Sequence, residues 1–384
     1  MIRIAILGST GSIGRSALEV VERHPDRFQV VALAVNRSVE ALAEQVHRHR
    51  PRWGVVVQEG LLEEVADLPR AEWRSGREAL LEIPEMDDVD VVVNALVGAA
   101  GLEPTLKTLD VGKRLALANK ESLVAGGELV MQAARDSAGD LIPVDSEHSA
   151  ILQCIEGYPM ESVARMILTA SGGPFRGWSR RELEEVRPSQ ALDHPTWSMG
   201  AKITVDSATL ANKALEVIEA HFLYGIDYDS LGVVVHPQSI VHSFVEFVDG
   251  SVLAQLGFPT MELPILYAMS YPERVGDDRL RTFDPIQASP LEFQEVDRQT
   301  FELFALGERA GREGGTSPAV FNAANEVAVE AFLQERVRFP EMGAVVARVL
   351  DELGGNPVEN LEQVLEMDLE ARRRAREAVG ALES

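Results

Sequence analysis

Two acidic residues at the end of a predicted strand are the first candidates for chemistry. Asp145 and Glu147 are two positions apart, so an extended chain turns both carboxylates to one side. Neighbouring anions repel each other unless a cation lies between them, and hard oxygen ligands suit Mg²⁺ or Mn²⁺. The pair therefore predicts a divalent-metal site, with an exposed acidic strand end as the structural alternative.

A third carboxylate lies on a predicted helix over Ala208–Tyr224, with a lysine and an amide beside it. Asn212, Glu216 and Glu219 share one face of that helix, and Lys213 lies at its edge. Glu216 could complete a three-carboxylate metal site. Only five of the 36 basic residues are lysines, so a retained lysine here is suggestive, because a compact ammonium differs chemically from a guanidinium fork. An amphipathic helix with ordinary Lys–Glu pairs is the alternative.

A glycine-containing loop supplies groups that fit an anionic substrate. Ser171 begins a Ser-Gly-Gly-Pro sequence whose hydroxyl and free amides can cradle a phosphate. Ser207, Asn212 and Lys213 could supply the remaining donors. Together these residues would form a local anion site on an otherwise acidic chain.

A second loop and two histidines complete the set of polar candidates. The segment from His194 to Gly200 contains Trp197 and Met199 and could close over a substrate and exclude water. The alternative is a buried loop anchored by Trp197. His236 and His242 could each act in the site or belong to the core.

A glycine triplet predicts the nucleotide site. Gly8, Gly11 and Gly14 lie between the first predicted strand and the first predicted helix, in the spacing GxxGxxG. Such glycines let the backbone turn tightly and approach a pyrophosphate, which the helix N-terminus then stabilises. The strand before, the helix after and the βαβ context favour dinucleotide binding over a purely structural turn.

The end of the second predicted strand indicates which dinucleotide binds. An NAD site usually carries Asp or Glu there, whereas a 2′-phosphate needs a cation and hydroxyls. This chain has Asn36, Arg37 and Ser38, so NADP is favoured. A helix N-cap at Ser38 beside a surface arginine is the alternative.

Composition excludes several classes of protein. The formal net charge is −25, from 36 basic and 61 acidic side chains, which disfavours nucleic-acid and anionic-membrane partners. The single cysteine, Cys154, excludes an intrachain disulfide or a thiolate metal cluster. The longest apolar stretch, Val89–Leu102, is interrupted by Asp90 and Asn94 and is too short to span a bilayer. We expect a cytoplasmic protein without a targeting segment.

Alternating strand and helix signals over the first 150 residues predict an α/β fold with an N-terminal doubly wound (Rossmann-like) domain. A central α+β catalytic domain with a hairpin at Asp249-Gly250 and a C-terminal helical domain follow. The expected strands of the first domain are Ile2–Leu7, Gln29–Val35, Gly54–Val57, Val89–Val93 and Arg114–Ala118. The expected C-terminal helices are Arg298–Ala310, Ser317–Gln334, Ala344–Leu353 and Val358–Val379. The predicted domains are 1–147 for NADPH, 148–272 for catalysis, a linker at 273–296, and the helices at 297–384.

Several motifs in order make the chain resemble the 1-deoxy-D-xylulose 5-phosphate reductoisomerase family over nearly its whole length. They include the Gly8–Gly14 loop, the sequence from Ala118 to Ser122, the Pro143–His148 acidic motif and the Ser171 loop. They continue with His194–Gly200, Val205–Thr209, Asn212–Glu216, His236–Ser243 and Asn322–Glu326.

The resemblance implies NADPH- and divalent-metal-dependent rearrangement and reduction of 1-deoxy-D-xylulose 5-phosphate to 2-C-methyl-D-erythritol 4-phosphate. This reaction belongs to the non-mevalonate route to isoprenoid precursors. The implied metal ligands are Asp145, Glu147 and Glu216, which together with Lys120 are also the implied catalytic residues. The implied substrate-binding residues are Ser146, Ser171, His194, Trp197, Ser207, Asn212 and Lys213. The implied cofactor-binding residues are Gly8, Thr10, Gly11, Ser12, Ile13, Asn36, Arg37, Ser38, Asn119, Glu121, Met199 and Gly200. A homodimer is also implied.

Two other functions remain open from the residues. A metal-independent, NADP-dependent dehydrogenase of the semialdehyde or homoserine type would share the first domain, but it would not need the three carboxylates. A non-enzymatic NADP-sensing protein could be built on the same fold. Within the family reaction, a one-step ketol shift and a retro-aldol/aldol path are both compatible with the sequence.

Overall fold

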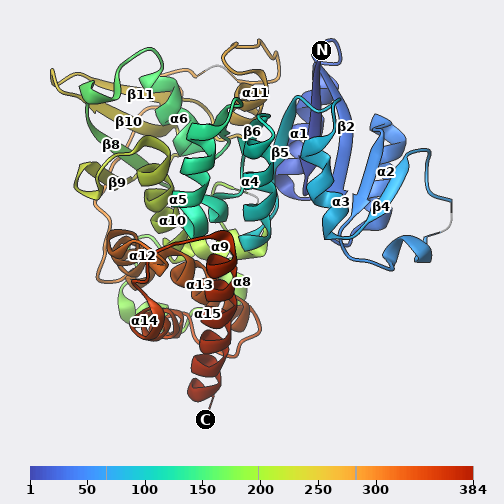
Figure 1. The fold of residues 1–384 in the computed structure, drawn as a ribbon. Coiled ribbons are helices and arrows are strands. Elements are labelled where there is room, and N and C mark those ends of the chain that lie inside the picture. The colour runs from blue at the N-terminus through green and yellow to red at the C-terminus, as the bar shows by residue number, and fades with distance from the viewer. Residues whose placement is uncertain (66, 198, 282, 384) are drawn as a thin grey trace. The chain divides into compact units, whose positions relative to one another are not determined.

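The computed structural model describes residues 1–65, 67–197, 199–281 and 283–383, which fall into two compact units (Figure 1). Unit 1 comprises Met1–Ser122, Val130–Ser149 and Thr260–Leu280. Unit 2 comprises Leu123–Leu129, Ala150–Pro259 and the residues from Arg281 onward. Helices α5 and α6 contribute residues to both units.

Unit 1 is built on a seven-stranded parallel sheet with the order β4-β3-β2-β1-β5-β6-β7. The strands are β1 (Ile2–Leu7), β2 (Phe28–Val35), β3 (Trp53–Val56), β4 (Glu72–Ser75), β5 (Val91–Asn94), β6 (Arg114–Leu117) and β7 (Leu141–Pro143). The apolar runs of β1 and β2 are buried almost throughout, as strands of a sheet covered on both faces must be. The predicted doubly wound sheet is confirmed.

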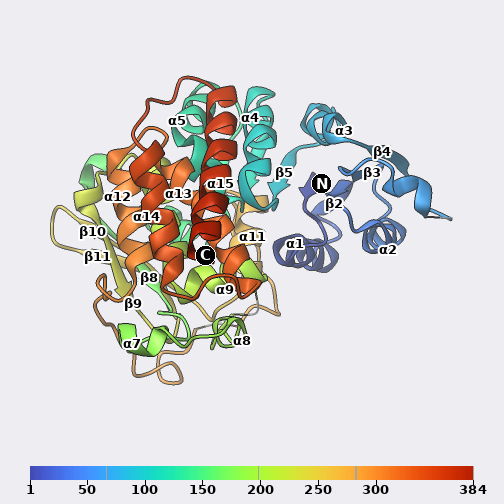
Figure 2. The same cartoon turned by 90° about the horizontal axis from the view of Figure 1, so that it is seen from below.

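Helices cover both faces of this sheet. Figure 2 shows α1 and α2 on one side of the strands and α3 on the other; α11 packs on α1, β6 and β7, and α4 packs on α3 and β6. The helices are α1 (Ser12–Arg23), α2 (Val39–His49), α3 (Arg77–Glu82), α4 (Leu102–Asp110), α5 (Lys120–Asp136) and α11 (Glu262–Ser270). The strand order reverses at β1, which pairs with both β2 and β5. The carboxyl ends of strands at such a point form the usual nucleotide crevice.

Unit 2 contains a four-stranded mixed sheet with the order β11-β10-β8-β9. The strands are β8 (Val163–Ala170), β9 (Leu231–Val235), β10 (Val241–Phe247) and β11 (Val252–Leu256). β10 and β11 are antiparallel neighbours joined through Asp249-Gly250, so the predicted hairpin is confirmed. β8 pairs antiparallel with β10 and parallel with β9.

A helical layer occupies the rest of unit 2. Figure 1 shows α12 to α15 gathered together in orange and red, and α13 packs against α9, α12, α14 and α15. The helices are α6 (Ser146–Ile155), α7 (Arg180–Leu183), α8 (Pro188–Ala191), α9 (Ala201–Ala208), α10 (Ala211–Tyr224), α12 (Glu302–Glu313), α13 (Ser317–Leu333), α14 (Glu341–Leu353) and α15 (Leu361–Leu382). One hydrophobic core joins α9 and α10 to these C-terminal helices.

Several elements differ from the sequence predictions. The helix predicted over Ala208–Tyr224 begins at Ala211 as α10, and Ala208 ends the preceding helix α9, because Leu210 between them adopts a left-handed conformation with φ of 60°. α12 begins at Glu302 and not at Arg298. The Asp297 carboxylate accepts hydrogen bonds from the backbone N–H groups of Gln299 and Thr300 and stabilises a turn before the helix. β4, β8 and α11 were not predicted at all; β4 is a short edge strand of sequence Glu-Trp-Arg-Ser with no apolar run.

In the described ranges, no helix combines the length and the apolar character that a bilayer crossing requires.

Candidate functional site

The loop after β1 has the backbone that the glycine triplet predicts. Gly8 has a φ of 87°, and Gly11 is the residue that precedes α1. The loop is anchored to β2, because the backbone N–H groups of Gly8 and Ser9 donate hydrogen bonds to Ala34 O on that strand. Gly11 and Ser12 are exposed at its tip. The first N–H groups of α1 therefore face outward, where a helix N-terminus stabilises an anion.

Close packing explains two of the three glycines. A Cβ atom added to Gly8 would lie 2.4 Å from Ala95 O, and one added to Gly14 would lie 2.4 Å from Gly8 O. Gly14 therefore lets α1 approach the end of β1. Gly11 has an ordinary φ of −71° and a nearest contact at 3.3 Å, so its small size keeps the exposed tip open.

Replacing Gly8 by alanine should destabilise unit 1 strongly. The substitution combines a left-handed conformation with a backbone clash, so we expect a loss of about 3 kcal/mol in the free energy of unfolding. Gly60→Ala is the matched control, because Gly60 has a φ of 84° with nothing within 4 Å of the added Cβ. It should lose only about 1 kcal/mol. Equal losses for the two variants in thermal unfolding would contradict the packing argument.

The segment after β2 leaves its polar groups at the surface. Asn36, Arg37 and Ser38 are all exposed. Ser38 lies at the N-cap position of α2, as the structural alternative predicted, but its hydroxyl makes no capping hydrogen bond. Within the described residues, the Arg37 guanidinium has no ion pair or hydrogen bond assigned to it. Both groups are accordingly available to a phosphate.

Asn119 fills a structural position at the start of α5. Its side-chain oxygen accepts from Ser122 N at 3.1 Å, and its amide donates to Leu96 O, Gly98 O and the Glu121 carboxylate. With 1% exposure, this side chain caps the helix and fixes the loop after β5. The Asn119 side chain is used by these contacts, so only its backbone is left to contact a cofactor. The side chain itself positions the start of α5 and the loop after β5.

The acidic motif after β7 is a helix start and not a strand end. β7 ends at Pro143, and α6 begins at Ser146. The prediction that Asp145 and Glu147 face one way in an extended chain is therefore wrong. The two carboxylates are nevertheless close, since their ligand oxygens lie within 4.8 Å of one another. The turn into α6 brings them together, and the Ser146 hydroxyl donates to Glu147 at 2.5 Å.

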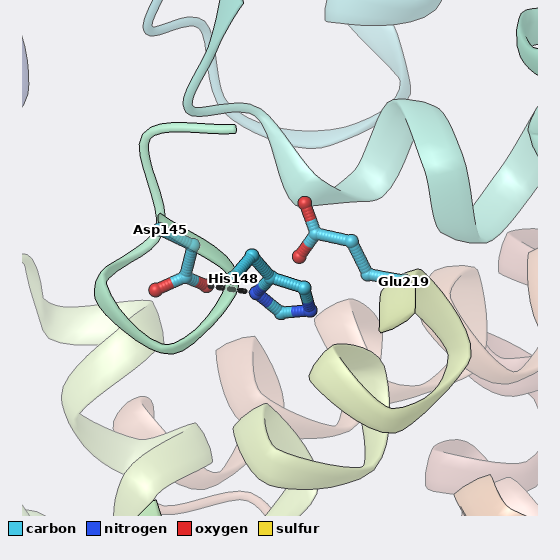
Figure 3. A group of neighbouring side chains, drawn as sticks. All are labelled: Asp145, His148 and Glu219. Atoms are coloured by element: carbon cyan, nitrogen blue, oxygen red, sulfur yellow. Dashed lines mark ion pairs between the residues drawn. The ribbon is translucent and has the colours of Figure 1, made fainter. Parts of the chain in front are cut away.

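A buried lysine and a buried histidine flank this acidic pair in unit 1. Lys120 Nζ lies 2.5 Å from Asp145 Oδ2, and only 9% of the lysine side chain is exposed. His148 Nδ1 lies 4.0 Å from the same oxygen, the ion pair drawn in Figure 3. Lys120 is the first residue of α5 and Asp145 precedes α6, so two helix N-termini hold the pair. A cation beside two carboxylates reduces their repulsion.

A second cluster of polar side chains lies at the start of α10, in unit 2. The Glu216 carboxylate accepts from the Asn212 amide at 2.5 Å and pairs with the Lys213 ammonium. Glu216 and Lys213 are 1% and 4% exposed. Glu219, one turn further along α10 and labelled in Figure 3, is equally buried. The predicted shared face of Asn212 and Glu216 is confirmed.

A histidine joins the two predicted phosphate hydroxyls. His194 Nε2 lies 3.1 Å from both Ser171 Oγ and Ser207 Oγ. The backbone N–H groups of Thr196 and Trp197 donate to His194 Nδ1, so Nε2 carries the ring proton. Burial lowers the pKa of His194, which favours this neutral form. When the imidazole donates to the serine oxygens, the hydroxyl hydrogens are free to point at an anion.

The rest of the predicted flap is an irregular loop leading into α9. Trp197 and Met199 are half-buried, and Gly200 is exposed at the N-cap of α9. Ser198, within the same motif, lies outside the described residues. Ser207 lies in the last turn of α9, a helix that was not predicted, and the helix predicted to follow Ser207 begins at Ala211 as α10.

The two uncertain histidines differ in role. The His236 ring stacks on Phe293 and uses both nitrogens, with Nδ1 2.8 Å from Glu292 O and Nε2 accepting from Ile240 N. It therefore fixes the loop before α12. Burial, together with the charge of Lys213, lowers the pKa of His242 to about 4, so His242 is neutral at physiological pH.

Two contacts around the predicted substrate residues were missed from the sequence. His194 was assigned to the flap and not to the serine pair. Asp206 and Asn325 were not singled out, although Asn325 Nδ2 donates to Asp206 Oδ1 at 2.8 Å. The scarcity of lysine was the available signal, because Lys120, Lys202 and Lys213 each pair with a buried or half-buried carboxylate.

Three family models match most of the chain. They are described as 1-deoxy-D-xylulose 5-phosphate reductoisomerase at residues 4–127, the C-terminal domain of the same enzyme at 141–224, and the DXP reductoisomerase C-terminal domain at 256–374. Proteins of that name from Chloroherpeton thalassium and Nocardia farcinica are 48% and 51% identical to the chain. The first match covers 97% of both chains; the second covers 99% of this chain and 95% of the relative.

Solved structures agree with the sequence matches. The reductoisomerase from Zymomonas mobilis in complex with NADPH is 40% identical, with a TM-score of 0.91, over 100% of this chain and 99% of that one. A DOX-P reductoisomerase in complex with NADPH, fosmidomycin and magnesium is 38% identical, with a TM-score of 0.92 over the full length of both chains. These matches do not favour the metal-free dehydrogenase or the NADP sensor.

Proposed function

Since the chain belongs to the 1-deoxy-D-xylulose 5-phosphate reductoisomerase family, we propose that its acidic pair, its buried lysines and its hydroxyl cluster are the working parts of that reaction. The enzyme converts 1-deoxy-D-xylulose 5-phosphate into 2-C-methyl-D-erythritol 4-phosphate with NADPH and a divalent cation, within the route to isoprenoid precursors. The substrate is a small sugar phosphate.

We propose Asp145, Glu147 and Glu216 as the ligands of Mg²⁺ or Mn²⁺. The observation that carries this assignment is the approach of the Asp145 and Glu147 carboxylate oxygens to within 4.8 Å of one another at the start of α6. An all-oxygen donor set fits these hard cations and not a thiolate-preferring metal. When bound, the cation polarises the substrate oxygens, and NADPH supplies the hydride.

Lys120 is the proposed catalytic cation beside the reacting carbons. Its side chain is nearly buried and its ammonium lies 2.5 Å from Asp145, so the position of the positive charge is fixed. A preorganised donor of this kind stabilises an oxygen anion that develops during the rearrangement, and it can return a proton to that oxygen. Ser146, on the first turn of α6, is the proposed hydrogen-bond partner of a substrate hydroxyl.

The substrate phosphate is proposed to bind in unit 2. Ser171 and Ser207, whose oxygens both accept from His194, have hydroxyl hydrogens to donate. Asn212 and Lys213 add an amide and a cation at the start of α10. Because the phosphate is remote from the chemistry, its binding energy can orient the substrate and draw the flap with Trp197 over it.

NADPH is proposed to bind along the carboxyl edge of the unit 1 sheet. The pyrophosphate would lie on the N-terminus of α1 and contact the exposed loop of Gly8, Thr10, Gly11, Ser12 and Ile13. The 2′-phosphate would contact Asn36, Arg37 and Ser38. Glu121, Met199 and Gly200 are the remaining proposed contacts, with Asn119 as their support.

Arg37→Ala should weaken NADPH binding selectively. Losing one exposed charge-assisted contact to the 2′-phosphate should raise the KM for NADPH roughly tenfold. The KM for NADH, which lacks that phosphate, should not change. Arg15→Ala is the matched control for the loss of an exposed arginine, and Arg15 donates to Thr10 O. If both cofactors lost affinity equally, Arg37 would not be reading the 2′-phosphate.

We further propose that the protein is a cytoplasmic homodimer. Within each chain, we propose that residues 1–147 bind NADPH, residues 148–272 form the catalytic domain, residues 273–296 form a linker and residues 297–384 form a helical domain. The acidic surface and the single, buried cysteine support the compartment. The edge strand β11, with Val252 and Leu253 exposed, supports pairing through the unit 2 sheet. Sedimentation at several protein concentrations tests the dimer; a strictly monomeric species would contradict it.

Substrate specificity tests the function. We expect NADPH oxidation with 1-deoxy-D-xylulose 5-phosphate, and 2-C-methyl-D-erythritol 4-phosphate as the product. Homoserine and semialdehyde substrates, tested in parallel, should give none. Turnover of those substrates without the sugar phosphate would instead support the dehydrogenase alternative.

A further inference from the structure

A buried carboxylate lies beside the proposed phosphate site without belonging to it. The Asp206 side chain is 1% exposed and immediately precedes Ser207 on α9. A second negative charge next to an anion site opposes binding unless it is neutralised. Its presence therefore needs a reason.

Two groups hold this carboxylate in place. Lys202 Nζ lies 2.7 Å from Asp206 Oδ2, one turn earlier on α9. Asn325 Nδ2 donates to Asp206 Oδ1 at 2.8 Å from α13, 119 positions away in the chain. Asn325 is fully buried. The lysine offsets the charge, and the asparagine fixes the carboxylate against the C-terminal helices.

The anchored carboxylate sits at the corner that places the phosphate donors. Asp206 O accepts from Thr209 Oγ1, and Thr209 Oγ1 accepts from Ala211 N, so the same residues bridge α9 and α10. Leu210 at this corner holds a left-handed φ of 60°, a strained conformation that persists only when the surroundings enforce it. The corner orients Ser207 on one side and Asn212 and Lys213 on the other.

The Ser171 loop depends on the same corner. A Cβ atom added to Gly173 would lie 2.7 Å from Ser207 O, so this loop packs directly on the end of α9. A shift of the corner would therefore separate Ser171, Ser207 and their shared partner His194. Since α13 is buried along most of its length, it is a rigid support.

We propose that Asp206 and Asn325 are positioning residues through which helix α13 sets the geometry of the substrate-phosphate site. This assigns the C-terminal helices a part in substrate binding, and it rests on the phosphate site proposed above. Lys202 is the counter-ion that lets a buried acid serve as this anchor. Neither Asp206 nor Asn325 touches the substrate.

Asn325→Leu tests the proposal, because it removes the donor while keeping the volume of the side chain. A buried carboxylate that loses a hydrogen bond relaxes toward other partners, and the corner moves with it. We expect the KM for 1-deoxy-D-xylulose 5-phosphate and the inhibition constant of inorganic phosphate to rise together, each roughly tenfold. The dissociation constant of NADPH, followed by fluorescence, should stay within twofold.

Asn322→Leu is the matched control. Asn322 is also fully buried on α13, but its amide donates to Glu326 of the same helix and not to α9. This variant should lower the melting temperature without changing the phosphate inhibition constant. If Asn325→Leu does not fold, Asn325→Ser replaces it and should give a smaller change of the same sign.

The outcomes separate the inference from the function on which it rests. An unchanged phosphate inhibition constant in a folded Asn325 variant would overturn the inference. So would an equal weakening of phosphate and NADPH binding, which indicates general loosening. A wild-type protein that turns over the substrate but is insensitive to inorganic phosphate would instead overturn the proposed phosphate site.

Discussion

Glu216→Gln is expected to lower kcat roughly a thousandfold, because the proposed metal loses a charged ligand worth several kcal/mol of transition-state stabilisation. Glutamine keeps the shape of the side chain and its contact with Asn212, so the fold should survive. The concentration of Mg²⁺ needed for half-maximal activity should rise in parallel. The dissociation constant of NADPH should change little, because the proposed cofactor contacts lie in other segments of the chain.

Glu219→Gln supplies the matched comparison for this variant. Glu219 is on the same helix, has the same 1% exposure and is also an acid, so its neutralisation has a similar structural cost. It should affect the metal requirement much less than Glu216→Gln does. If the two variants lost activity and metal affinity equally, or if Glu216→Gln weakened NADPH binding as much as turnover, Glu216 would belong to the fold and not to the metal site.

Lys120→Met is expected to lower kcat by roughly a hundred- to a thousandfold, the size seen when one preorganised donor to a developing oxyanion is removed. Methionine preserves the apolar stem of the side chain and removes only its charge. The metal should not bind more weakly, because the lysine ammonium competes with the metal for Asp145. A kinetic defect with undiminished Mg²⁺ affinity would thus distinguish Lys120 from the three proposed ligands.

Lys107→Met controls for the removal of a lysine from the same unit. Lys107 pairs with Glu85 near the surface, at 2.5 Å, and neither residue is among the proposed site residues. Its kcat should match that of the wild type. A Lys120→Met enzyme with normal kcat and a raised KM would show that Lys120 binds the substrate but does not assist the chemistry.

The parallel sheet and the glycine loop were accessible from the sequence because local signals determine them. β1 from Ile4 to Leu7 and β2 from Val30 to Val35 are continuous apolar runs, and only a strand buried on both faces requires such runs. Gly8 and Gly14 occur where a side chain would meet backbone atoms, so their spacing carries the geometry of the turn. In these segments, the conformational preferences of the residues and the hydrophobic pattern of the sequence agree with the packing in the structure.

The corner between α9 and α10 was not accessible in the same way. A leucine in a left-handed conformation contradicts its local preference, so the sequence reads as one helix through Leu210. Likewise Asp145 and Glu147 read as an extended pair, although a turn into α6 brings them together. The Asp206–Asn325 contact joins positions 119 residues apart and leaves no periodic trace. Tertiary contacts decide each of these features.

The most direct test of the account is NADPH oxidation with 1-deoxy-D-xylulose 5-phosphate, measured after exhaustive removal of divalent cations and again after adding Mg²⁺ or Mn²⁺. We expect no turnover in the metal-free enzyme and full recovery with either cation, while NADPH binding is the same in both states. Turnover that persists in the metal-free enzyme would contradict the assignment of Asp145, Glu147 and Glu216 as a metal site essential to the reaction.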